Sequence, residues 1–192
     1  MLLLNSKEGL KMLKTDYEGK YINELRKGFD KKIKNLSELK ENLCLNNIDI
    51  LNINALKKEI IPLYLKEYTH KSMLYIIKAN FISKNYKEKI SEAQKKNVFA
   101  MARINKNNFD YTASKNICLY VGSSHNIYKR LLEHLGFGAQ KTFALHLEKW
   151  WDNLPIQIEI YEVCNNENDA LQIIEDILWE QNKPLFGRQG KK

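Results

Sequence analysis

The stretch YVGSSHNIYKR, residues 120–130, decides the fold of the second half of the chain. The apolar run Ile117 to Val121 that leads into it predicts a strand. Asn126 is suited to cap a helix N-terminus, and Gly136 is suited to end one, so a helix is predicted up to about Leu135. The stretch therefore predicts a strand that turns directly into a helix.

Two further strands are predicted around this stretch. Ile156, Ile158 and Ile160 alternate with polar residues, as in a half-buried strand. Residues 98–104 favour a strand that pairs with residues 117–121 as a hairpin. The connection 105–116 is long for a hairpin, so it is either a functional insertion or a mobile loop, and both alternatives stay open.

Two more helices complete the expected fold. One spans roughly Lys141 to Trp151, and the other runs from about Asn168 to Asn182 and stops before Pro184. Residues 97–192 thus predict an α/β domain with a small three-stranded antiparallel-type sheet flanked by helices. This layout alone implies no activity.

Residues 1–96 show few strand signals. Their apolar residues recur at helical spacing, as between Leu56 and Tyr68, so we expect an all-helical N-terminal region. This region has 20 Lys and Arg against 12 Asp and Glu, whereas residues 97–192 have 11 of each. The excess charge predicts a DNA-binding or specificity element, or else a lysine-rich solvated surface. Arg26 is the one arginine among these cations, which weakens the case for specific phosphate contacts.

The rest of the composition excludes several classes. Met1 to Leu4 is too short for the apolar region of a signal peptide, so we expect a cytoplasmic protein without membrane segments. Cys44, Cys118 and Cys164 lack CxxC spacing, which argues against a disulfide framework and a thiolate zinc site. They are expected to be reduced and buried.

Four side chains carry candidate chemistry. Tyr120 faces the opposite side of its strand from Leu119 and Val121, Arg130 and His134 share one helix face, and Glu175 borders the apolar stripe of the last helix. Each alone is more often packing or an ordinary surface residue. Together they supply the groups that phosphodiester hydrolysis needs: a phenol, a guanidinium, an imidazole and a metal-binding carboxylate.

The second half resembles the GIY-YIG nuclease superfamily over about residues 97–190. The segment from Tyr120 to Arg130 is similar to the family's second signature and its catalytic arginine. His134 corresponds to a histidine of many homing and restriction members, and Glu175, before Pro184, to the metal-binding glutamate.

The resemblance implies a DNA endonuclease that uses Mg²⁺ or Mn²⁺ and acts in restriction, homing, repair or defence. Glu175 would bind the metal, Arg130 would stabilise the transition state, and Tyr120 would activate or position water, with help from His134. A symmetric double-strand cutter would act as a homodimer. Two departures, Phe99 in place of the first-signature tyrosine and Gly187 in place of an asparagine, motivate the alternative of a catalytically silent DNA-binding or regulatory protein.

Overall fold

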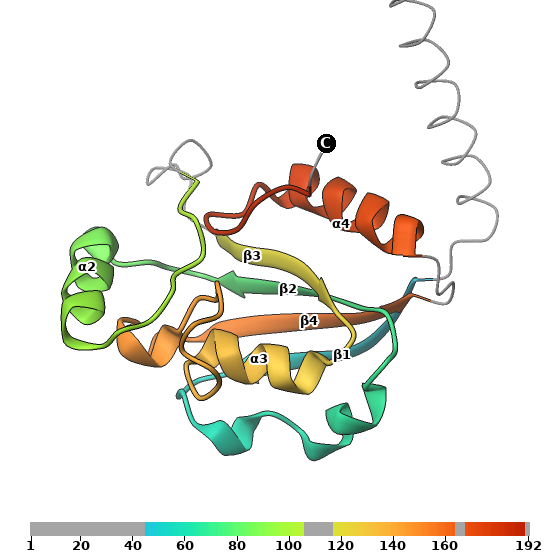
Figure 1. Cartoon of the computed structure of the whole chain (residues 1–192), viewed down its shortest axis with the longest axis horizontal. Helices are drawn as coiled ribbons and strands as arrows, with labels where there is room; N and C mark the ends of the chain where they lie inside the picture. The colour runs from blue at the N-terminus through green and yellow to red at the C-terminus, as the bar shows by residue number, and fades with distance from the viewer. Residues whose placement is uncertain (1–44, 106–116, 164–167, 191–192) are drawn as a thin grey trace, which may run out of the picture. The chain divides into compact units, whose positions relative to one another are not determined.

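A computed structural model of the chain describes residues 45–105, 117–163 and 168–190. They form a four-stranded antiparallel sheet in the order β1-β4-β2-β3 (Figure 1). The strands are β1 (Leu45–Ile53), β2 (Met73–Ala79), β3 (Ile117–Ser124) and β4 (Ile156–Val163). The predicted α/β class is confirmed, and β3 and β4 lie where strands were expected, but the sheet has four strands rather than three.

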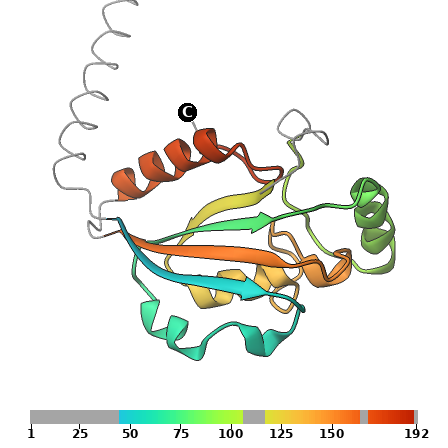
Figure 2. The same cartoon turned by 180° about the vertical axis from the view of Figure 1, so that it is seen from behind.

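Helices cover both faces of this sheet (Figures 1 and 2). The α-helices are α2 (Tyr86–Lys96), α3 (Ile127–Leu135) and α4 (Asn168–Asn182), and the 3-10 helices are η1 (Lys58–Ile60), η2 (Leu63–Tyr68) and η5 (Leu147–Lys149). Helix α3 begins as predicted, because the Asn126 side chain accepts a hydrogen bond from the Lys129 N–H at 3.0 Å. It ends at Gly136, whose φ of 101° favours glycine.

The two faces of the sheet bury different sets of side chains. Tyr75 and Ile77 of β2 pack into the main core with the apolar side of α3, whereas Ile76 and Val121 pack against Leu178 and Trp179 of α4. A register shift between Ile77 and Lys78 places Leu119 in the main core as well. The expectation that Leu119 and Val121 share one face is therefore wrong.

The all-helical interpretation is wrong for the described part of residues 1–96. Strands β1 and β2 both precede residue 97, and residues 44–192 form one compact unit. The apolar run Met73 to Ile77 does not alternate, because β2 lies between β4 and β3 and is buried on both faces. The helical spacing between Leu56 and Tyr68 produces only η1 and η2. Helices predicted within residues 1–44 lie outside the described residues.

The strand predicted at residues 98–104 is an extended segment outside the sheet. It forms single bridges, Met101 with Ala144 and Ile104 with Phe186. The strand that pairs with β3 is β2, not this segment. Of the loop predicted at 105–116, Asn105 donates its N–H to the Leu185 carbonyl at 2.7 Å, and the remainder lies outside the described residues.

The helix predicted between Lys141 and Trp151 is also wrong, because this segment holds only η5. Trp150 and Trp151 are buried, and their indole N–H groups donate to the carbonyls of Leu145 and Leu154 at 2.7 and 2.9 Å. These side chains belong to the core.

Two expectations from composition are addressed in part. Cys118 is buried and not in a disulfide, while Cys44 and Cys164 lie outside the described residues. Among the helices of the described ranges, none combines the length and apolar character that crossing a membrane requires.

Candidate active site

Two tyrosines from neighbouring strands stack at the centre of the site. The ring centroids of Tyr75 on β2 and Tyr120 on β3 are 6.0 Å apart, with 8° between the ring planes. Gly122 pairs with Tyr75 across the strands, and a Cβ atom there would lie 2.7 Å from both Tyr75 Oη and Tyr120 Cε1. The two rings therefore occupy the space that a side chain at position 122 would need.

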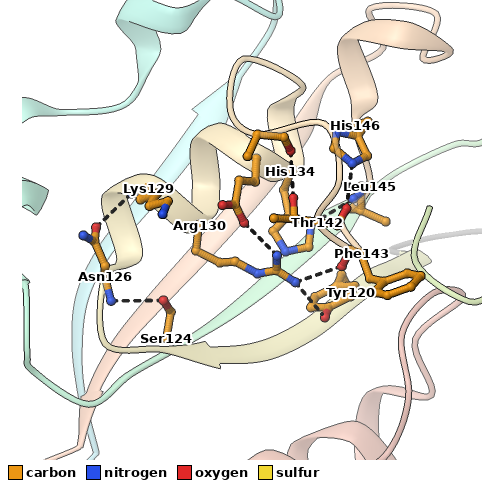
Figure 3. Close-up of polar contacts among 12 residues, drawn as sticks. Tyr120, Ser124, Asn126, Lys129, Arg130, His134, Thr142, Phe143, Leu145 and His146 are labelled. Carbon is orange, nitrogen blue, oxygen red and sulfur yellow. Dashed lines mark hydrogen bonds and ion pairs between the residues drawn. The ribbon is translucent and has the colours of Figure 1, made fainter. Parts of the chain in front are cut away.

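Arg130 extends from α3 to both tyrosines. Its Nε donates to Tyr75 Oη at 3.2 Å. Its Nη2 donates to Tyr120 Oη at 3.3 Å and to the Phe143 carbonyl at 3.0 Å (Figure 3). Its Nη1 donates to Glu133 Oε2 at 2.8 Å. Burial disfavours the charge, but the two tyrosines and Glu133 outweigh burial and raise the pKa of Arg130. The guanidinium is thus a fixed positive charge.

His134 packs against Tyr75, with ring centroids 5.4 Å apart, and is fully buried. Burial, followed by the charge of Arg130 and by His146, holds the pKa of His134 well below its ordinary value, so the imidazole is neutral at pH 7. Nδ1 accepts the Leu145 N–H at 3.2 Å, which leaves the ring proton on Nε2. Nε2, 2.9 Å from Tyr75 Oη, is therefore the donor in that hydrogen bond.

These contacts fix the state of the Tyr75 hydroxyl. Its oxygen accepts hydrogen bonds from both Arg130 and His134, so its own proton is free to be donated elsewhere. Burial first, and then Tyr120, raise the pKa of Tyr75 well above its ordinary value, although Arg130 opposes this shift. Tyr75 is therefore a protonated hydroxyl at neutral pH.

Glu175 approaches the same region from α4. Its carboxylate accepts hydrogen bonds from the hydroxyl and the N–H of Ser123 on β3, and it interacts electrostatically with Arg130 and with Tyr75. Burial raises the pKa of Glu175, Asp176 raises it further, and Ser123 and Arg130 oppose the shift. A half-buried carboxylate that is costly to ionise is a position that a cation would stabilise.

The donor set fits a hard divalent cation held by few protein ligands. Within residues 45–105, 117–163 and 168–190, no three His, Cys, Asp or Glu residues cluster as a metal site. Magnesium is commonly bound through one or two carboxylates together with water and substrate oxygens. Glu175 beside Ser123 is consistent with a site of that kind.

An open cleft of about 380 Å³ lies against this cluster. Its wall is formed by residues of three loops together with Tyr120 and Arg130: Met101, Ala102, Arg103, Tyr120, Arg130, Phe143, Gly187 and Arg188. Gly187 has a φ of 101°, and a Cβ atom there would lie 3.0 Å from Tyr120 Cε2. Glycine at this position thus leaves room for the Tyr120 ring.

The comparison with protein families agrees with this geometry. Residues 109–189 match the model of the GIY-YIG catalytic domain. This match lies in the C-terminal half of the chain and covers less than half of its residues. GIY-YIG catalytic domains are a nuclease family, and the matched segment is similar to that family. No curated protein and no solved structure matches the chain.

The structure brings the four predicted residues into one region. Tyr120, Arg130 and His134 are joined through hydrogen bonds that converge on Tyr75 and Arg130, and Glu175 interacts with both of these electrostatically. His134 faces Tyr75 rather than solvent. The matched range contains all four predicted residues and begins after Tyr75.

The alignment of Phe99 with the first-signature tyrosine stays a prediction, because the family match begins at residue 109. Phe99 is buried against His146, with ring centroids 5.0 Å apart, and does not line the cleft. Tyr75, which sequence reasoning missed, is the phenol that stands beside Tyr120. The signal that could have revealed it is the unbroken apolar run Met73 to Ile77, which is typical of a strand buried on both faces.

Proposed function

We propose that the protein is a divalent-metal-dependent endonuclease that hydrolyses phosphodiester bonds in DNA. The observation that carries the proposal is the Arg130 guanidinium, held on the wall of an open cleft by Tyr75, Tyr120, Glu133 and the Phe143 carbonyl. Arginine matches the geometry of a phosphate and keeps its charge as negative charge develops on the oxygens. A guanidinium fixed before the substrate arrives needs no reorganisation during the reaction.

The phenols contribute the second element of the mechanism. Tyr120 lines the cleft and would position the attacking water, while Tyr75, which is buried and is not among the residues that line the cleft, would hold Arg130 in place through its hydroxyl oxygen. His134 acts through Tyr75 as a positioning residue, because it is buried and donates to the Tyr75 oxygen. Tyr75 thus provides the hydroxyl that Phe99 lacks.

Glu175 is the proposed metal ligand, with Mg²⁺ or Mn²⁺ as the cofactor. A divalent ion bound there would supply charge neutralisation for the phosphate and its leaving oxygen. Ser123 orients the carboxylate by donating two hydrogen bonds to it. The raised pKa of Glu175 implies that burial disfavours the charged form of this carboxylate, which a bound cation would stabilise.

The basic N-terminal part supports DNA as the substrate. Residues 1–96 carry the whole excess of positive charge, and we propose that they add DNA affinity or specificity. Because β1 and β2 belong to the sheet, the part to delete in a test is residues 1–43, which precede the compact unit. The shortened protein should bind DNA more weakly and with a smaller salt dependence, whereas an unchanged salt slope would favour a protein-interaction role.

A nicking assay on supercoiled plasmid with Mg²⁺ or Mn²⁺ tests the catalytic proposal. Wild-type protein should nick the plasmid, and Arg130→Lys and Glu175→Gln should each lose about 10²-fold or more in rate, because each removes one group that stabilises the transition state. Equal cleavage by all three proteins would assign the activity to a contaminant. No cleavage by wild-type protein with either metal would contradict the proposal.

A second candidate is a catalytically silent DNA-binding protein, and Gly187 is the observation that favours it. If the missing asparagine is the reason for silence, Gly187→Asn should create activity. The structure predicts the opposite, because the new side chain would meet Tyr120 and occupy a left-handed backbone position. A gain of cleavage in Gly187→Asn would therefore support the second candidate.

A further inference from the structure

The wall of the cleft carries two arginines that the predicted site does not include. Arg103 and Arg188 line the cleft together with Arg130, and no acidic residue is among the lining residues. Both side chains are exposed. Among the described ranges of the chain, neither side chain has a hydrogen-bond or ion-pair partner, whereas the Arg130 guanidinium makes four such bonds.

Backbone hydrogen bonds place these two arginines next to each other. The Gly187 N–H donates to the Arg103 carbonyl at 2.8 Å, and Ile104 and Phe186 form an antiparallel bridge. Arg103 and the residue that precedes Arg188 are therefore joined directly. These contacts with Phe186 and Gly187 hold the extended segment around Arg103, which is not a strand of the sheet.

The same junction is connected to the strand that bears Tyr120. Leu185 and Phe186 donate their N–H groups to the carbonyls of Cys118 and Leu119 on β3, both at 2.9 Å. The order across the cleft floor is thus the Arg103 segment, the Arg188 segment and β3. The backbones that carry both arginines are held in register with the strand that presents Tyr120 to the cleft.

A nucleic-acid strand needs positive charge at more than one phosphate. Arg130 is already committed to the two tyrosines, Glu133 and a carbonyl, so it can serve one phosphate at most. Unpaired guanidinium groups on the same wall are free to bind the neighbouring phosphates as forks. A single free phosphate or a mononucleotide would leave these extra charges without a partner.

We propose that Arg103 and Arg188 bind the phosphates that flank the one placed at Arg130, so that the cleft holds a continuous strand. This inference rests on the proposed nuclease function, because it assigns the flanking contacts of that same site. The two residues are binding residues rather than catalytic ones, since Arg130 occupies the position beside the phenols.

Equilibrium binding without cleavage tests the inference. Binding of a fluorescently labelled DNA duplex by the full-length protein is followed by anisotropy in EDTA over a series of salt concentrations. The variants are Arg103→Ala, Arg188→Ala and the double alanine variant, with Arg103→Lys and Arg188→Lys as charge-retaining variants and Lys141→Ala as the charge-matched control. Lys141 is an exposed cation that does not line the cleft and lies outside the basic residues 1–96.

Each alanine variant should bind more weakly, and the slope of log K against log salt should shrink by about 0.9 for each phosphate that is no longer bound. The slope of the double variant should shrink by about 1.8, and the lysine variants at both positions should keep the wild-type slope because they keep the charge. Lys141→Ala should retain the wild-type slope. Thermal denaturation should show little change, because both side chains are exposed.

A double variant with the wild-type slope, or a Lys141→Ala effect as large as that of the arginine variants, would overturn the inference. The outcome is separable from that of the nicking assay. Protein that cuts plasmid but keeps its salt slope in the double variant refutes only the flanking contacts. Protein that binds DNA through Arg103 and Arg188 but never cuts refutes only the catalytic proposal.

Discussion

Replacing Tyr75 by phenylalanine removes the hydroxyl on which the site converges. The Nε–H of Arg130 and the Nε2–H of His134 both lose their acceptor, at 3.2 and 2.9 Å in the native structure. A buried donor left without a partner costs about 1–3 kcal/mol. The Arg130 side chain is 21% exposed and His134 is fully buried. Taking the low end for Arg130, we expect Tyr75→Phe to lower the free energy of unfolding by about 2–4 kcal/mol.

The effect on cleavage should be larger than this loss of stability suggests. A typical domain is stable by about 5–15 kcal/mol, so the variant should remain folded at 25 °C. Arg130 loses one of the groups that fix it, so the guanidinium is held less accurately and the nicking rate should fall by about 10²-fold. Urea denaturation followed by circular dichroism measures the first quantity, and plasmid nicking by folded protein measures the second.

Phe99→Tyr is the matched control. If Phe99 held the first-signature position, adding the hydroxyl would increase cleavage. In the structure Phe99 is 7% exposed and packs on His146, so the added oxygen should lower stability by about 1–3 kcal/mol and leave cleavage no higher. Wild-type cleavage by Tyr75→Phe, or increased cleavage by Phe99→Tyr, would refute the placement of the active phenol on β2.

Three other perturbations probe the same cluster. Gly122→Ala should lower the urea midpoint and the nicking rate, because the added Cβ atom would lie 2.7 Å from atoms of Tyr75 and Tyr120. An unchanged urea midpoint would mean that the two tyrosine rings move freely. Without metal, Glu175→Gln should be at least as stable as wild-type protein, because burial penalises the charged form of Glu175. Mg²⁺ should raise the melting temperature of wild-type protein but not that of Glu175→Gln. Equal rises in the two proteins would exclude Glu175 as a metal ligand. Because folding lowers the pKa of His134, the unfolded chain binds a proton more readily, and the free energy of unfolding should fall as the pH drops below about 6.5. His134→Gln should flatten this pH dependence. Identical pH profiles for the two proteins would contradict the role of His134 in it.

Local signals in the sequence predicted the helices that frame the site. Asn126 and Gly136 mark the two ends of α3. The apolar stripe of α4, followed by Pro184, predicts the limits of that helix at Asn168 and Asn182. These features act within one or two helical turns, so residue type and spacing are sufficient to identify them. Arg130 and His134 followed from α3, and their shared helix face brought them to one cluster.

Long-range pairing could not be inferred in the same way. The pairing of Tyr75 with Gly122 joins segments separated by a helix and an extended segment, and no local pattern records it. Residues 98–104 look like a strand because they are apolar and precede β3, but backbone bonds to Gln140, Ala144 and Gly187 replace pairing with the sheet. For this reason the sequence predicts residues 98–104 as the partner of β3, whereas the partner in the structure is β2.

The reactive centre combines two strands that are far apart in the sequence, and β2 lies between β4 and β3 in the sheet. A gene fragment that begins at residue 109, where the family match begins, would encode Arg130 and Glu175 but neither Tyr75 nor the strand on which Tyr120 leans. Transfer of the proposed activity to another protein by recombination thus requires a gene segment that starts before β1. Crossovers between β2 and β3 should yield active chimaeras only when both parent proteins preserve the contact between the two aromatic rings.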